Sequence, residues 1–133
     1  MEQVTIEEQR LVDGKKFPLV FSPSTSENSF QKIVSSRRDE VYDLLRSHKG
    51  ILFRGFDLTD GTDFHNAVTA LQLNPMDYIG GAAVRTQITP LVFTANESPA
   101  SEKIPFHHEM SQVKSNENFD FLSVCIFTSL LEL

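Results

Sequence analysis

The residues of this chain whose types and spacing could do chemistry lie at positions 104–110, where His107, His108 and Glu109 are adjacent. Successive side chains of a β-strand point to opposite faces, so His107 and Glu109 would share one face and His108 would point to the other. An imidazole and a carboxylate on one face supply two of the three ligands of the facial triad that holds non-haem Fe(II). The third ligand would have to come from another part of the chain.

Spacing by itself is weak evidence for a metal site. With four histidines and 18 acidic residues among 133 positions, about half of one His-x-acid triplet is expected by chance. A polar strand edge or loop is therefore the favoured interpretation on spacing alone. The earlier histidines are not expected to add ligands. His48 falls at the predicted end of a helix. His65 lies one position off the apolar stripe of a second predicted helix and is interpreted as a surface or half-buried structural residue.

The composition is that of one globular domain. Of the 133 residues, 40% are hydrophobic and 23% charged, which is close to globular averages and sufficient for a modest core. The formal net charge of −6 argues against a nucleic-acid-binding surface, which needs clustered lysine and arginine. A single cysteine, Cys125, excludes an intrachain disulfide and a cysteine-based zinc site. The acidic N-terminus lacks the features of a signal or transit peptide, and a cytoplasmic protein is expected.

The hydrophobic pattern predicts alternating strands and helices before the motif. Strands are predicted at residues 4–6, 17–21, 51–53 and 91–94, and helices at residues 29–47 and from the N-cap candidates at 59–62 through residue 73. Asp13-Gly14 is expected to form a hairpin turn. The helix at 29–47 is predicted to break near Ser35-Ser36, and Gly50 is expected to adopt the left-handed conformation that closes it.

Three stretches of the chain carry a resemblance to a known family. They are KGILFRGF (49–56) with Asp63-Phe64, GGAAVRT (80–86) with VFTANE (92–97), and IPFHHEM (104–110). Together they resemble the taurine dioxygenase and clavaminate synthase-like family of Fe(II)/2-oxoglutarate-dependent oxygenases, in its plant-like branch. The likeness runs from about residue 17 to residue 113, and the combination is far more specific than any of its parts. It implies that His107 and Glu109 are iron ligands, with Fe(II) as cofactor and 2-oxoglutarate as co-substrate.

The resemblance also implies a fold and a reaction. The expected fold is α+β and mostly β, the N-terminal part of a double-stranded β-helix, or jelly roll, with flanking helices. The expected reaction is that of an oxidoreductase, a dioxygenase or hydroxylase, which uses molecular oxygen and 2-oxoglutarate to oxidise a small-molecule substrate. Arg85 and Thr86 would lie near the pocket, where substrate contact and a surface salt bridge are alternatives. His108 is expected to pack or hydrogen-bond beside the metal ligands.

The chain departs from the family pattern after Glu109, because no histidine or arginine follows it. The family's distal histidine and its 2-oxoglutarate-binding arginine would therefore be missing. We expect residues 1–113 to be the N-terminal portion of an oxygenase domain, and residues 114–133 a divergent apolar tail of a C-terminally truncated member. Such a chain is expected to bind Fe(II) weakly and not to turn over 2-oxoglutarate.

The alternative function belongs to another class of protein. A non-catalytic truncated fragment could act as an interaction module through its apolar tail or an open sheet edge. The apolar run of that tail is about 11 residues long, which is too short for a bilayer that takes roughly 20. No membrane span is therefore expected in either case.

Overall fold

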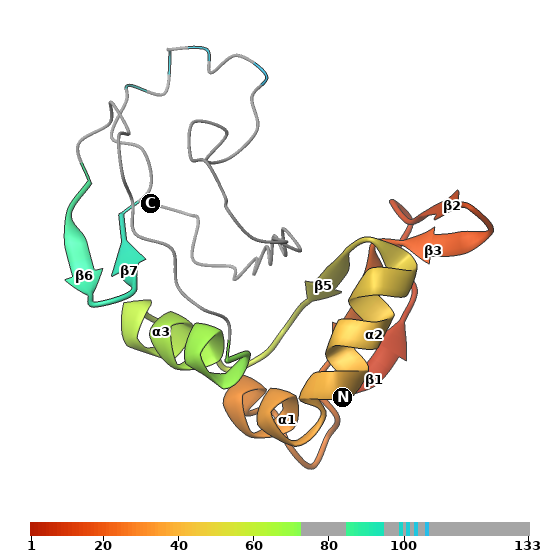
Figure 1. Ribbon diagram of the computed structural model, residues 1–133, viewed down its shortest axis with the longest axis horizontal. Helices are drawn as coiled ribbons and strands as arrows, with labels where there is room; N and C mark the ends of the chain where they lie inside the picture. The colour runs from red at the N-terminus through yellow and green to blue at the C-terminus, as the bar shows by residue number, and fades with distance from the viewer. Residues whose placement is uncertain (73–84, 95–98, 100, 102, 104–105, 107–133) are drawn as a thin grey trace, which may run out of the picture. The chain divides into compact units, whose positions relative to one another are not determined.

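The computed structural model describes residues 1–72, 85–94, 99, 101, 103 and 106 (Figure 1). The described residues fall into two compact units, one holding residues 1–72 and the other residues 85–106. Each unit is described by itself. The first contains five strands and three helices, and the second contains one hairpin of two strands.

A three-stranded mixed sheet with the strand order β1–β4–β5 is the centre of the first unit. Strand β1 (Glu2–Val4) pairs antiparallel with β4 (Leu19–Ser22), which pairs parallel with β5 (Ile51–Phe53). Helices α1 (Phe30–Ser36) and α2 (Arg38–His48) connect the two parallel strands, as a parallel pair requires a crossover. The apolar residues of β4 are at most 5% exposed, which fits a strand covered on both faces.

The core of this unit joins the sheet to all three helices. Helix α1 packs against α3 (Gly61–Ala70), and the hydroxyl of Tyr42 on α2 donates a hydrogen bond to the carbonyl of Leu71. Burial raises the pKa of that tyrosine. The buried cluster consists of Leu19, Phe21, Phe30, Val34, Val41, Leu45, Ile51, Phe53, Leu58, Ala67, Ala70 and Leu71.

The predicted break in the first helix is confirmed, and it falls at Arg37. This residue leaves the helical conformation with φ −128° and ψ 23°, after the hydroxyl of Ser36 donates to the carbonyl of Ile33 at 2.9 Å. Arg37 then holds the first turn of α2, because its Nε and Nη2 atoms lie 2.7 and 2.6 Å from the carboxylate of Glu40. That contact lowers the pKa of Glu40.

The predicted helix closure at Gly50 is wrong by one residue. Lys49 adopts the left-handed conformation, with φ 66°, and its N–H donates to the carbonyl of Leu45 at 2.8 Å. Gly50 is needed for a different reason, because a Cβ atom there would lie 2.8 Å from Cε2 of Phe17. The glycine permits close packing of a ring, and the lysine carries the backbone strain.

Replacing Lys49 by glycine is expected to raise the free energy of unfolding by about 1 kcal/mol, because glycine reaches the left-handed region without a Cβ clash. Chemical denaturation of the two chains measures the difference. An unchanged or lower value for Lys49→Gly would contradict the expectation.

The predicted turn at Asp13-Gly14 is confirmed, but the strands that it joins are not those expected. Both residues have positive φ, 51° and 75°, and they connect β2 (Arg10–Val12) to β3 (Lys15–Phe17). The predicted strand at 4–6 begins earlier, as β1, and pairs with β4 instead of forming the hairpin. The sequence pattern missed β2, since all three of its residues are exposed and show no apolar alternation.

Helix α3 begins as predicted, with Asp60 as N-cap. Its carboxylate Oδ1 accepts from the backbone N–H groups of Thr62 at 2.7 Å and Asp63 at 2.9 Å. The helix ends at Ala70, earlier than predicted. In the second unit, β7 (Val92–Phe93) confirms the central two of the four residues predicted as a strand at 91–94, and its antiparallel partner β6 (Gln87–Thr89) was not predicted.

The described residues confirm the predicted mixture of helices and strands, arranged in three small sheets. The jelly roll and the proposed boundary at residue 113 stay predictions. Among the described helices, none combines the length and apolar character that crossing a bilayer requires.

Candidate functional site

The predicted iron ligands His107 and Glu109, with His108 between them, lie outside the described residues. Their role as ligands therefore stays a prediction. Phe106, which directly precedes His107, is described and fully exposed. The described residues closest in sequence to the motif that form regular structure are those of the β6–β7 hairpin.

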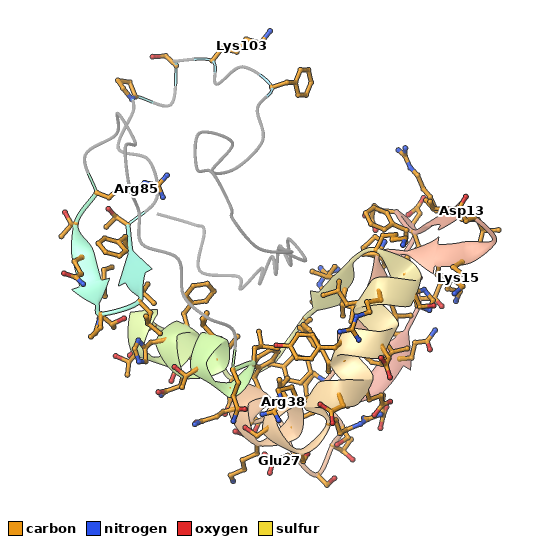
Figure 2. All side chains as sticks on the ribbon, in the orientation of Figure 1. Asp13, Lys15, Glu27, Arg38, Arg85 and Lys103 are labelled. Carbon is orange, nitrogen blue, oxygen red and sulfur yellow. The ribbon has the colours of Figure 1, made fainter. Side chains whose placement is uncertain are left out.

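Thr86 closes the open end of this hairpin. Its backbone N–H donates to Oγ1 of Thr94 at 2.9 Å, and the N–H of Thr94 donates back to the carbonyl of Thr86 at 2.9 Å. Arg85 is the residue before this closure and is half-buried (Figure 2). The contacts give Thr86 a structural role in the hairpin. For Arg85, substrate contact and a surface salt bridge stay the two alternatives.

The two histidines of the first unit have structural positions, as predicted. His48 ends α2, and its ring N–H donates from Nδ1 to the carbonyl of Lys16 at 2.8 Å, which ties the helix to β3. His65 is half-buried on α3, where its carbonyl accepts from the hydroxyl of Thr69. Within the residues that the structure describes, no three histidine, cysteine or acidic side chains converge to hold a metal.

Several carboxylates of the first unit satisfy backbone N–H groups at helix starts. Asp57 accepts from the N–H of Phe30 at 3.1 Å, so it joins the loop before α3 to the first turn of α1. Glu27 accepts from the N–H of Ser29 at 2.9 Å, and this bond is the main reason that its pKa is lowered. The hydroxyl and N–H of Thr59 likewise lower the pKa of Asp63. These three acids therefore help to position helix starts.

The contact between Asp57 and Phe30 was missed from the sequence. The two residues are 27 positions apart, and no local spacing rule connects them. The local signals at Ser29 and Asp60 were visible, because a short polar side chain before an apolar periodic run predicts an N-cap.

Comparison with known proteins supplies the family. No family model matches the chain. It is 38% identical over 120 residues to a clavaminate synthase-like protein of Arabidopsis thaliana, a match that covers 84% of this chain and 36% of that protein. This chain belongs to the clavaminate synthase-like family.

A second relative is more distant. The chain is 27% identical over 99 residues to the dapdiamide synthesis protein DdaC of Enterobacter agglomerans, a match that covers 74% of this chain and 30% of that protein. The chain therefore spans about a third of the length of the curated relatives it matches.

Proposed function

We propose that this chain is part of an Fe(II)/2-oxoglutarate-dependent dioxygenase and that His107 and Glu109 are two of its iron ligands. The 38% identity to the clavaminate synthase-like protein is the observation that carries the proposal. At 84% coverage, about 21 of the 133 residues lie outside that match. Glu109 is followed by 24 residues. Because fewer residues than this lie outside the match, both proposed ligands fall within the matched part of the chain wherever the match begins.

The chemistry of the donor set fits the metal. An imidazole nitrogen and a carboxylate are ligands of the non-haem Fe(II) facial triad, and two positions apart on a strand they share a face. Bound Fe(II) would supply the oxidative chemistry that couples 2-oxoglutarate decarboxylation to oxidation of a small-molecule substrate. Glu109 would reach the metal with an arm one methylene longer than that of aspartate. His108 would then hydrogen-bond beside the ligands and fix their orientation.

Within this proposal, residues 1–113 are the oxygenase portion and residues 114–133 a segment of different character. Strands β4 and β5 with helices α1, α2 and α3 supply a buried framework before the motif, and the β6–β7 hairpin precedes the motif in the sequence. Substrate selection would depend on residues around the metal, of which Arg85 is a candidate.

The proposal is tested by anaerobic titration of the 133-residue chain with Co(II), a spectroscopic substitute for Fe(II). We expect His107→Ala and Glu109→Gln each to weaken Co(II) binding by at least about 10-fold, since disturbing even a partner of a ligand costs that much. The matched control is His65→Ala, which removes an imidazole outside the motif and should leave Co(II) binding unchanged. Equal affinity in wild type and His107→Ala would reject the ligand assignment and favour a non-catalytic interaction module.

A further inference from the structure

The β2–β3 hairpin carries the exposed apolar side chains of the first unit. Leu11 is 74% exposed, Val12 42% and Phe17 38%, and among residues 1–72 these are the large apolar side chains that face solvent. Figure 1 shows the hairpin beside the C-terminal end of α2, where His48 and Ser47 contact it. Exposed apolar side chains gathered on one element mark a binding surface more often than scattered ones do.

Cations without a carboxylate partner gather at the same place. Arg10, Lys15 and Lys16 on the hairpin, and Lys49 beside it, form no ion pair with any described residue. Lys15 and Lys16 instead contact the hydroxyls of Ser47 and Thr5, which leave their charges uncompensated. By contrast, the lysine and arginine side chains of helices α1 and α2, and Arg37 between these helices, each form an ion pair. The pairs are Lys32–Glu27, Arg37–Glu40, Arg38–Asp39 and Arg46–Asp43.

The hairpin also has an open backbone edge. Its two-residue turn makes Val12 and Lys15 the hydrogen-bonded pair that closes the ladder, so Leu11 and Lys16 form a non-hydrogen-bonded pair. The N–H and C=O of Leu11 therefore point away from β3. Because this sheet has two strands, that edge of β2 is unpaired within the described residues.

We propose that this edge docks an extended acidic peptide of a partner protein, which adds as a third strand beside β2. The peptide backbone would bond the N–H and C=O of Leu11, as in other cases of strand addition. Successive side chains of a strand lie on opposite faces, so the apolar side chains of the peptide would cover Leu11 on one face, and its carboxylates would meet Arg10 and Lys15 on the other. An anionic membrane is a poorer partner, because Asp13 lies at the tip of the hairpin and would be brought against the anionic headgroups (Figure 2).

The test uses a short fluorescein-labelled peptide of alternating glutamate and valine, followed by fluorescence anisotropy with the 133-residue chain. Charge reversal at Lys15→Glu with Lys16→Glu is expected to weaken binding at least about 10-fold, since it replaces attraction by repulsion. Arg54→Glu is the matched control, because Arg54 is an exposed cation without a described carboxylate partner at the other end of β5, and it should bind as wild type. A peptide with lysine in place of glutamate should not bind.

Amide hydrogen exchange separates strand addition from a purely electrostatic contact. The Leu11 amide should exchange more slowly when the acidic peptide is present, whereas the amide of exposed Glu8 should not change. Absence of peptide binding, or equal binding by the charge-reversed chain, would overturn the proposal. Binding to phosphatidylserine vesicles but not to the peptide would overturn it in favour of a membrane surface.

Discussion

Replacing Phe30 by alanine is expected to lower the free energy of unfolding by about 3–5 kcal/mol, because it empties a fully buried site. The Phe30 side chain is 0% exposed, and its ring meets those of Phe53 and Phe56 edge to face, at centroid distances of 4.9 and 5.5 Å. It thus joins α1 to β5 and to the loop after that strand. Truncation removes both the transfer free energy of the ring and its contacts with two neighbours.

Urea denaturation followed by far-ultraviolet circular dichroism measures the loss, since the chain has no tryptophan to report unfolding by fluorescence. The matched control is Leu11→Ala, an apolar truncation at a side chain that is 74% exposed, which should be nearly neutral. Phe30→Leu should cost less than Phe30→Ala because it leaves a smaller cavity. A loss below about 1 kcal/mol for Phe30→Ala would show that the surrounding core collapses into the space.

Gly50→Val is expected to cost about 1–3 kcal/mol through overpacking. A Cβ atom at this position would lie 2.8 Å from Cε2 of Phe17, closer than carbon atoms can approach without movement. The backbone cannot easily give way, because the carbonyl of Gly50 accepts the N–H of Leu19 at 2.9 Å beside the parallel strand pair. The ring of Phe17 must move instead.

A double-mutant cycle tests this origin of the cost. Phe17→Ala alone should lower the free energy of unfolding only a little, because the ring is 38% exposed. In the Phe17→Ala chain, Gly50→Val should cost much less stability than it costs in the wild-type chain. Strictly additive effects of the two substitutions would show that the valine destabilises the chain by some route other than the ring.

Residues with a clear local signal were predicted well. The apolar run Ile51–Phe53 is a buried strand, and the helix break near Ser35-Ser36 and the N-cap at Asp60 are confirmed. Strands β2 and β6 were missed, because short exposed strands bury no face and therefore impose no apolar alternation on their residues. The exchange of roles between Lys49 and Gly50 was invisible too, since it depends on a ring 33 positions away.

The candidate site divides in the same way. Residue type and spacing show that His107 and Glu109 can share a face, and this information is local. A third ligand and a substrate pocket depend on residues brought together from distant parts of a fold, which spacing does not encode. The long-range contact between Asp57 and the N–H of Phe30 shows the same limit inside the first unit.

The left-handed backbone at Lys49 has a consequence for how this surface could evolve. Glycine at position 49 would relieve the backbone strain of the left-handed conformation. It would also remove one of the four cations at the β2–β3 hairpin. A chain carrying Lys49→Gly should therefore be harder to denature and should hold an acidic partner less tightly. Stability and peptide binding are therefore opposed at this position, and selection for binding would retain the lysine in its strained left-handed conformation.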